Sequence, residues 1–254
     1  MNITLNKDKS IGKVLYIVEG GSTEPYILRK IFTQIFDYQY ETLLRDKNYK
    51  QYNSKVNPHS KIFVINAEES NIKNIDKDND FLNNLFAELI TNYDFDIDNA
   101  AIYYLFDRDN QSNTDVEMIR SFIGELVNAR DNPDYIRQGL LLLSYPSVES
   151  FTLSNFLKNS FDYKFSLGSE LKQFLHNKNI NHQQVSAETL LSATNEMVDA
   201  FGVIGVDTYN LDNFRNCNMT IFNYEEDTYE IETAYRALSL VCISLIDLGL
   251  VEVE

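Results

Sequence analysis

Four short apolar runs constrain the fold of this chain more than any other feature of its sequence. They lie at residues 14–18, 62–65, 101–106 and 140–143. None of them alternates apolar with polar residues, as a strand with one solvent-exposed face would. A continuous apolar run is typical of a strand that is covered on both faces, as in a parallel sheet.

Stretches with helical periodicity separate these runs. Apolar residues recur at three- and four-residue spacing over residues 27–36, 81–90 and 118–127. Strands and helices that alternate over residues 13–144, joined by right-handed crossovers, predict an α/β fold with a mainly parallel four-stranded sheet and helices on both faces. Thr23 fits the N-cap of the first helix, and Pro25 fits its first turn.

The pattern changes after residue 150. Helices are expected at residues 148–157, 169–176, 187–200 and 230–248. Residues 201–210 are expected to add a strand or a buried loop. Because no Gly/Ser-rich or Pro-rich linker intervenes, we expect residues 12–150 to form one domain and residues 151–254 a largely helical extension that packs on it.

The composition is that of an ordinary globular chain. It has 254 residues, of which 44% are hydrophobic, and no apolar run reaches the roughly 18 residues that a membrane span needs. The first residues also lack the apolar segment of a signal peptide. Cys217 and Cys242 lie far apart and outside any Cys/His cluster, which disfavours a zinc site. We therefore expect a cytoplasmic protein without membrane contact.

The charge is unevenly distributed along the chain. The net charge of -16 disfavours a polyanionic partner, but the N-terminal quarter carries more basic than acidic residues. Lys47, Lys50 and Lys55 interleave there with Tyr49 and Tyr52, which would suit phosphate contact with base stacking. A solvated connector explains the same stretch, and either reading predicts a poorly packed loop.

Acidic residues follow the predicted strands, at the edge where open parallel sheets bind ligands. They are Glu19 after the first run, Glu68 and Glu69 after the second, Asp107 and Asp109 after the third, and Glu149 after the fourth. The pair after the second run is typical of surface or capping residues. The others would raise one another's pKa, and a cation would relieve the repulsion. Oxygen ligands without cysteine or histidine favour Mg²⁺ or Mn²⁺.

These residues carry a resemblance to a known family. The segments "VLYIVEGGSTEPYIL" and "YYLFDRDNQ" resemble the TOPRIM domain, whose signature is a glutamate after the first strand and a DxD motif after the third. The resemblance covers residues 12–145. The elements "EGGSTEP", "FDRD" and "SYPSVESF" look closest to the RloB-like and OLD-type TOPRIM proteins of bacterial anti-phage and abortive-infection systems.

The resemblance implies a Mg²⁺- or Mn²⁺-dependent endonuclease. Glu19 would act as a general acid/base or as a metal ligand, and Asp107 and Asp109 would hold a cation. Glu149 and Glu24 would complete a second metal site. Two ions in such a site activate a water molecule and stabilise the leaving oxygen during phosphodiester hydrolysis.

The resemblance also implies a phosphate site at the start of the first helix, where free N–H groups can receive an anion. Its residues would be Gly20, Gly21, Ser22 and Thr23. Arg108 or Arg29 would offset the charge of the scissile phosphate. Arg108 is the weaker candidate, because in an extended segment it points away from its aspartate neighbours.

Other α/β families fit the motifs less well. A haloacid-dehalogenase phosphatase carries its DxD motif after the first strand. A receiver domain needs an acidic pair after the first strand and a lysine after a later strand, and neither is found in this sequence. A Rossmann dehydrogenase needs a GxGxxG motif, which "EGGSTEP" lacks.

The sequence does not identify the substrate or the protein partners of this chain. The chain has no GxxxxGK[ST] loop, so a nuclease of this kind is expected to depend on a separate ATPase or sensor protein. The substrate is DNA, tRNA or another RNA, and a homodimer is left open. The alternative is a TOPRIM-fold protein with little catalysis of its own, which docks on a basic partner through its acidic surface.

Overall fold

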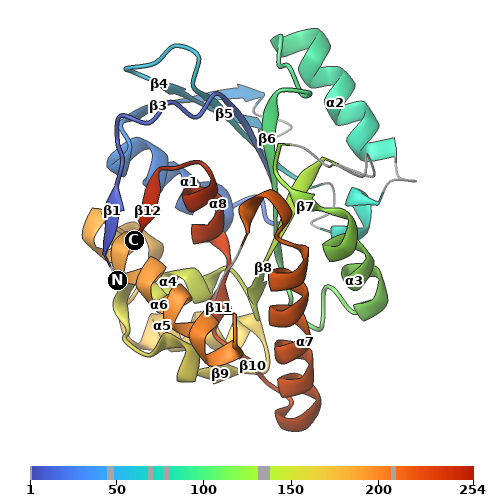
Figure 1. The fold of residues 1–254 in the computed structure, drawn as a ribbon, viewed down its shortest axis with the longest axis vertical. Coiled ribbons are helices and arrows are strands. Elements are labelled where there is room, and N and C mark those ends of the chain that lie inside the picture. The colour runs from blue at the N-terminus through green and yellow to red at the C-terminus, as the bar shows by residue number, and fades with distance from the viewer. Residues whose placement is uncertain (1, 45–48, 68–70, 77–79, 131–137, 207–209) are drawn as a thin grey trace.

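The computed structural model describes residues 2–44, 49–67, 71–76, 80–130, 138–206 and 210–254. These residues form an α/β fold in which helices flank a mixed, mostly parallel central sheet (Figure 1). Two short strands near the termini, β1 (Ile3–Leu5) and β12 (Val251–Val253), pair antiparallel and hold the two ends of the chain together.

The four apolar runs are confirmed as four parallel strands. They are β2 (Lys13–Val18), β5 (Lys61–Asn66), β6 (Ala100–Asp107) and β8 (Gly139–Tyr145), in the spatial order β8-β6-β2-β5. β2 pairs with β5 and β6 along its whole length, so that Val18 lies opposite both Asn66 and Leu105. The carboxyl ends of these strands therefore reach the same edge of the sheet.

The sheet is wider than the sequence suggested, with eight strands among the described residues instead of four. A hairpin of β3 (Tyr38–Leu44) and β4 (Tyr49–Ser54) extends the sheet beyond β5. On the other side, β7 (Val127–Asn128) and β11 (Leu238–Ser239) pair antiparallel with β8. The hairpin is largely polar and the other two strands are two residues long, so none of them produces a continuous apolar run.

This hairpin shows that the expectation of a poorly packed loop was wrong for residues 49–54, which form β4, whereas residues 55–59 form a largely exposed connection. Tyr49 and Tyr52 are buried in the core. The centroid of the Tyr52 ring lies 5.9 Å from that of Phe32. Neither tyrosine ring is therefore available to stack on a base.

Two of the three lysines of the same stretch, Lys50 and Lys55, lie in the described residues. Lys50 is half-buried in β4, where burial lowers its pKa. Lys55 is exposed and forms an ion pair with Asp37. Lys47 lies outside the described residues, as do Glu68 and Glu69.

The three helices expected between the central strands are confirmed. α1 (Thr23–Lys30) continues as the π-helix η1 (Ile31–Ile35). In Figure 1, α1 lies on one side of the sheet together with α8 (Val241–Asp247), and α2 (Asp80–Tyr93) and α3 (Val116–Glu125) lie on the other. The short helix η3 (Ile72–Ile75) precedes α2. The N-cap of α1 is Ser22, not Thr23, which is already helical.

The residues after 150 are largely helical, as expected. Their helices are α4 (Glu149–Phe156), η4 (Ser160–Asp162), α5 (Gly168–Asn177), η5 (His182–Gln184), α6 (Ala187–Ile204), η6 (Leu211–Asn213), α7 (Arg215–Glu232) and α8. The short strands β9 (Lys164–Phe165) and β10 (Tyr235–Arg236) pair with each other. No helix in the described part of the chain is both long and apolar enough to cross a membrane.

Two expectations for this region were wrong. Residues 201–204 are the last turn of α6, which ends at the left-handed Gly205, so they form no strand. A single helix over residues 230–248 is also excluded, because α7 ends at Thr233 with φ 56°. The chain then passes through β10 and β11 before α8 begins. The apolar spacing after residue 233 reflects burial of these short elements, not one continuous helix.

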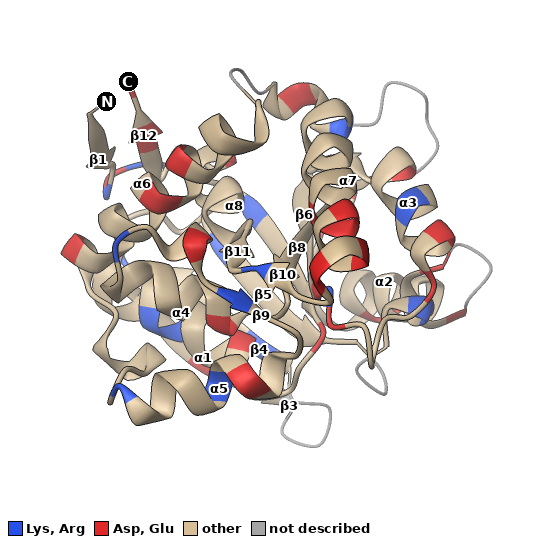
Figure 2. Cartoon of the chain, turned by 90° about the horizontal axis from the view of Figure 1, so that it is seen from below, with Lys and Arg blue, Asp and Glu red and all other residues tan. Residues whose placement is uncertain are grey.

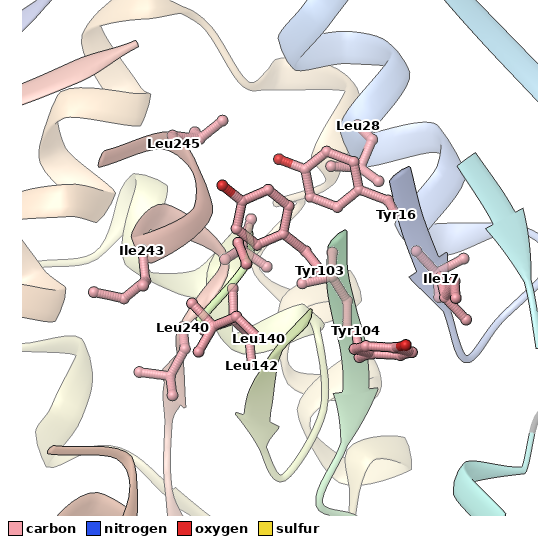
Figure 3. Close-up of a cluster of buried hydrophobic side chains, with 14 of the residues drawn as sticks. Tyr16, Ile17, Leu28, Tyr103, Tyr104, Leu140, Leu142, Leu240, Ile243 and Leu245 are labelled. Atoms are coloured by element: carbon pink, nitrogen blue, oxygen red, sulfur yellow. The ribbon is translucent and has the colours of Figure 1, made fainter. Parts of the chain in front are cut away.

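One continuous apolar core joins the central sheet to the C-terminal helices. Figure 3 shows Tyr16 of β2 and Tyr103 of β6 on the side of the sheet that faces Leu245 of α8. The two tyrosine rings stack with centroids 5.1 Å apart, and the Tyr16 hydroxyl donates to Ser244 Oγ at 3.0 Å. The helix α8 is therefore an integral cover of the sheet.

A buried carboxylate in α7 makes the fold sensitive to pH. Glu225 is fully buried; its Oε2 accepts the Arg236 N–H at 2.9 Å, and its Oε1 has no partner among the described residues. Burial raises the pKa of Glu225 to about 8. The folded protein therefore keeps a proton on this group at pH values where the unfolded chain releases it.

This proton makes the free energy of unfolding fall as pH rises from about 5 to 8, by up to about 1.4 kcal/mol per pH unit. We expect Glu225→Gln to flatten that slope and to exceed the wild type in stability at pH 8. Urea unfolding at a series of pH values measures both effects. Glu230→Gln, which changes an exposed carboxylate of the same helix, should leave the slope in place. A slope unchanged in Glu225→Gln would contradict this account of the buried carboxyl.

Candidate active site

The register of the sheet brings the predicted acidic residues to one edge. Glu19 follows β2 directly, and its N–H donates to Leu105 O at 3.0 Å, which continues the ladder one residue past the strand. Asp107 ends the adjacent strand β6. Glu149 begins α4, just after β8, and Glu24 lies in the first turn of α1. We refer to Glu19, Glu24, Asp107 and Glu149 as the carboxylate cluster.

Neutral donors fix two of these carboxylates. Glu19 Oε2 accepts the backbone N–H of Asp107 at 2.8 Å and the side-chain amide of Asn113 at 3.2 Å. Asp107 Oδ1 accepts the Val148 N–H at 2.7 Å, which ties the end of β6 to the loop before α4. These bonds orient the carboxylates without neutralising their charge.

The other two carboxylates are held by residues close to them in sequence. Glu149 Oε2 accepts the hydroxyl of Ser147 at 2.8 Å. Glu24 Oε1 accepts the Gly20 N–H at 3.0 Å, across the turn between β2 and α1. Among the described residues, the cation that pairs with the cluster is Lys172 of α5, whose Nζ lies 3.5 Å from Glu149 Oε1. Burial opposes the charge of Lys172, but Glu149 and Asp107 outweigh it and raise the lysine pKa.

Burial and mutual repulsion raise the pKa values in the cluster. Glu19 is 8% exposed and Glu24 is 5% exposed. Burial raises the pKa of Glu19 to about 7, and the charge of Glu24 adds to the shift. Burial also raises the pKa of Asp107 well above its usual range, helped by the charges of Glu19, Glu24 and Glu149. The pKa of Glu24 is raised by burial and then by Glu149. Burial and mutual repulsion therefore favour protonated over ionised carboxyls in the cluster.

Asp109 belongs to the same loop but turns toward another element. Its Oδ2 accepts the N–H of Gly168, the first residue of α5, at 3.0 Å. Its Oδ1 accepts the Gln111 N–H at 2.9 Å. A carboxylate at a helix N-terminus is favoured by the helix dipole. Asp109 therefore positions α5 beside the cluster in this structure, while Asp107 alone of the DxD pair points its carboxylate toward Val148 and the cluster.

Arg108 does not reach the cluster. It is fully buried, and its Nε and Nη2 donate to the Glu226 carboxylate of α7 at 2.8 and 2.7 Å. Its Nη1 donates to Asn113 O at 2.7 Å. The guanidinium is thus fully engaged on the α7 side of the sheet, and the expectation that it offsets the charge of a phosphate is corrected. Arg29 lies in the last turn of α1, 4.2 Å from the centroid of the Tyr40 ring, and makes no contact with the cluster.

At Gly20 the turn between β2 and α1 accommodates a carboxylate. A Cβ atom at Gly20 would lie 2.6 Å from Glu24 Oε2. Glycine therefore makes room for the Glu24 side chain, which already occupies the Gly20 N–H. Ser22 and Thr23 begin α1 without a side-chain cap, and Gly21 is exposed before them. Among the residues expected to bind phosphate, Gly20 therefore contacts the cluster, because its N–H donates to Glu24.

The donor chemistry of the cluster fits a hard divalent cation. All of its ligand atoms are carboxylate oxygens, and burial together with their mutual repulsion raises the pKa values of Glu19, Glu24 and Asp107, so a cation would be favoured beside them. Among the described residues no three His, Cys, Asp or Glu side chains form a ready cage for a metal ion. Mg²⁺ does not need one, because it usually keeps several water molecules and takes one or two carboxylates.

Three residues of the site were not found from the sequence. Asn113, 2% exposed, bridges Glu19 Oε2 and the Asp107 carbonyl, the latter at 2.6 Å. Ser147 and Lys172 both contact Glu149. The "SYPSVESF" element pointed to the region of Ser147, but a lysine on a C-terminal amphipathic helix carries no signal that separates it from a surface residue.

Comparison of the chain with protein-family models, with curated proteins and with solved structures gave no match.

The contact between Gly20 and Glu24 generates a stability prediction. Gly20→Ala should displace the Glu24 carboxylate and lower the free energy of unfolding by about 1 kcal/mol, the cost of a hydrogen bond that a buried group loses. In a Glu24→Ala background, Gly20→Ala should leave the free energy of unfolding unchanged or raise it slightly, because the space that the Glu24 carboxylate occupied is then empty. Chemical denaturation of the four proteins in this double-mutant cycle gives the coupling energy. Additive effects, with a coupling below about 0.5 kcal/mol, would mean that Gly20 is required for another reason.

Proposed function

We propose that this chain is a Mg²⁺- or Mn²⁺-dependent nuclease that hydrolyses phosphodiester bonds of nucleic acid. The carboxylate cluster is the observation that carries the proposal. Its residues come from four elements, meet at the carboxyl edge of the sheet, and have Lys172 as their neighbouring cation among the described residues. A bound divalent cation would offset the mutual repulsion that, after burial, raises their pKa values.

The motif positions support the same proposal. Glu19 follows the first central strand, and Asp107 ends the strand that is paired with it. This is the placement that the TOPRIM resemblance implies for its glutamate and its DxD motif. We therefore propose a TOPRIM-type catalytic domain at residues 12–150. Asp109 would join the metal ligands only if its carboxylate left the Gly168 N–H.

Asp107 and Glu149 are the residues that would hold the cation, with Glu24 beside them. When bound, the cation supplies activation of a water molecule and stabilisation of the leaving oxygen. Glu19 would move the proton, because its burial, which persists when a cation is bound, raises its pKa toward neutral pH and lets it both accept and return a proton. The Asp107 N–H and Asn113 hold this carboxylate by its Oε2, so that the proton can exchange at Oε1.

The biological setting is proposed from the sequence elements. The resemblance to RloB-like and OLD-type proteins favours an effector of anti-phage defence in the cytoplasm. Such an effector would act with a separate ATPase or sensor protein. Co-purification of that partner from the native host is the direct check on this part of the proposal.

A second candidate is a partner-binding protein with little catalysis of its own. Figure 2 shows acidic residues gathered on α7, whose C-terminal half contains Glu225, Glu226, Asp227, Glu230 and Glu232. Glu225 is buried and Glu226 pairs with Arg108, but Asp227 and Glu230 are exposed. This helix would suit docking on a basic protein surface.

Glu19→Gln tests the nuclease proposal. The change keeps the shape of the side chain but removes a charge and the proton acceptor, so we expect the apo protein to be at least as stable as the wild type. Mn²⁺-dependent nicking should fall by about 10²- to 10⁴-fold, the usual contribution of a general acid/base. Asp107→Asn should lose nicking and also the rise in Tm that Mn²⁺ gives the wild type.

The matched control is Glu230→Gln, an exposed carboxylate of α7 outside the cluster, which should cleave like the wild type. Cleavage is measured with and without chelator on DNA and RNA substrates. Wild-type activity in both Glu19→Gln and Asp107→Asn would exclude the mechanism. A wild type that never cleaves in Mn²⁺ would leave the partner-binding candidate.

A further inference from the structure

A cavity of about 340 Å³ opens beside the carboxylate cluster and shares Glu149 with it. Its walls come from α4, α5 and the segment that leads into η5, all of them after residue 148. Its volume lies at the low end of the range of about 300–1,000 Å³ that small-molecule sites occupy. The cavity can therefore take one small unit of a larger substrate, and it places that unit next to the proposed site of cleavage.

The lining of the cavity combines an apolar surface with groups that bind phosphate and polar ring edges. Leu175 and Ile180 supply the apolar surface, and Asn179 supplies an amide that can both donate and accept hydrogen bonds. Lys172 contributes a positive charge at the end that Glu149 shares with the cluster. A cation at one end and apolar and amide surface at the other match the phosphate and the base of a nucleotide.

A buried hydroxyl in the same wall lacks a partner. Thr152 lines the cavity, is 2% exposed, and its Oγ1 has no hydrogen-bond partner among the described residues. Buried polar groups are nearly always paired with protein, water or ligand. Thr152 Oγ1 is thus a polar atom of this wall whose hydrogen-bonding capacity the described residues leave unused.

Aromatic rings border the cavity on the side of α1. Two of the three histidines of the chain, His176 and His182, line it. The ring of His182 packs against Tyr26 of α1 with centroids 4.7 Å apart, and Tyr26 is 41% exposed. Burial lowers the pKa of His182, which keeps its ring neutral at pH 7. A neutral imidazole beside an exposed tyrosine is a suitable surface for stacking a base.

Basic residues continue this surface beyond Tyr26. Tyr26 also lines a second, smaller hollow of about 180 Å³ together with Arg29 and Lys30. Because residues 26, 29 and 30 share one face of a helix, the aromatic ring and the two cations form a continuous strip. The strip runs along α1 away from the end that carries Glu24.

We propose that the cavity binds one unstacked nucleotide of a single-stranded nucleic acid, with its base against His182 and its phosphate at Lys172, and that the strand continues over Tyr26 to Arg29 and Lys30. This inference rests on the proposed nuclease function and names its substrate as a single strand. A paired base would have to leave its duplex to enter a cavity of this size, so duplex of the same sequence should bind more weakly.

Binding of a fluorescein-labelled single-stranded 12-mer tests the proposal by fluorescence anisotropy. It is measured in Mg²⁺ with the wild type and with the Glu19→Gln protein, using DNA and RNA of one sequence and the matching duplex. His182→Ala should weaken binding about tenfold, the effect of losing one stacked base. Lys172→Gln should weaken binding and lower the slope of log affinity against log salt by about one.

Two neighbouring substitutions serve as matched controls. Gln183→Ala alters the next residue of η5, and Lys178→Gln removes an exposed lysine just after α5. Neither residue lines the cavity. Both variants should bind like the wild type. Competition with adenosine monophosphate, adenosine and inorganic phosphate then shows which part of the nucleotide the cavity recognises. Adenosine monophosphate should compete at least tenfold better than adenosine or phosphate alone.

Several results would overturn the proposal. These are wild-type binding by His182→Ala and Lys172→Gln, equal binding of duplex and single strand, competition by phosphate as strong as by the nucleotide, or no oligonucleotide binding at low salt. The two proposals fail separately. If binding depends on His182 and Lys172 but the protein shows no Mn²⁺-dependent cleavage, the nuclease proposal is wrong and the nucleotide site stands. If the protein cleaves nucleic acid but His182→Ala and Lys172→Gln bind it like the wild type, the nucleotide site is wrong and the nuclease proposal stands.

Discussion

The burial of like charges at the carboxyl edge of the sheet is the constraint on which the rest of this structure depends. Glu19 and Asp107 are neighbours because β2 and β6 are paired, and the Asp107 N–H donates directly to the Glu19 carboxylate. Glu24 and Glu149 close around them from α1 and α4. Four carboxylates that repel one another would weaken the fold if nothing offset their charge. The surrounding backbone N–H groups and the amide of Asn113 hold them in place, but these neutral donors do not cancel their charge.

The loop after β6 shows how the fold meets this constraint. Three consecutive residues point to three different elements: Asp107 to the cluster, Arg108 to Glu226 of α7, and Asp109 to the start of α5. The contacts of Arg108 and Asp109 bind the C-terminal helices α7 and α5 to the loop, so α5 can present Lys172 and the cavity beside the cluster. The C-terminal residues are therefore part of the site, although the sequence suggested only that they pack on the sheet.

The sequence predicted the central part of the fold because buried parallel strands leave an unmistakable apolar run. It also located the cluster, since the carboxyl ends of such strands must share an edge. It missed the β3–β4 hairpin, whose buried residues include tyrosines within a polar stretch, and it placed one long helix where Thr233 ends α7. The direction of Arg108 and the role of Gly20 could not be predicted, because both depend on contacts with Glu226 and Glu24 that only the folded chain creates.

The central claim is that the cluster lacks positive charge and takes a divalent cation. Isothermal titration of the apo protein with Mn²⁺ near pH 7, repeated in buffers of different ionisation enthalpy, measures both metal uptake and the protons released with it. The account predicts saturable binding to one or two sites with release of protons, because metal ligands must be deprotonated. It also predicts affinity at least tenfold weaker in Asp107→Asn. Saturable binding that is unchanged in Asp107→Asn, or no binding at millimolar Mn²⁺, would contradict it.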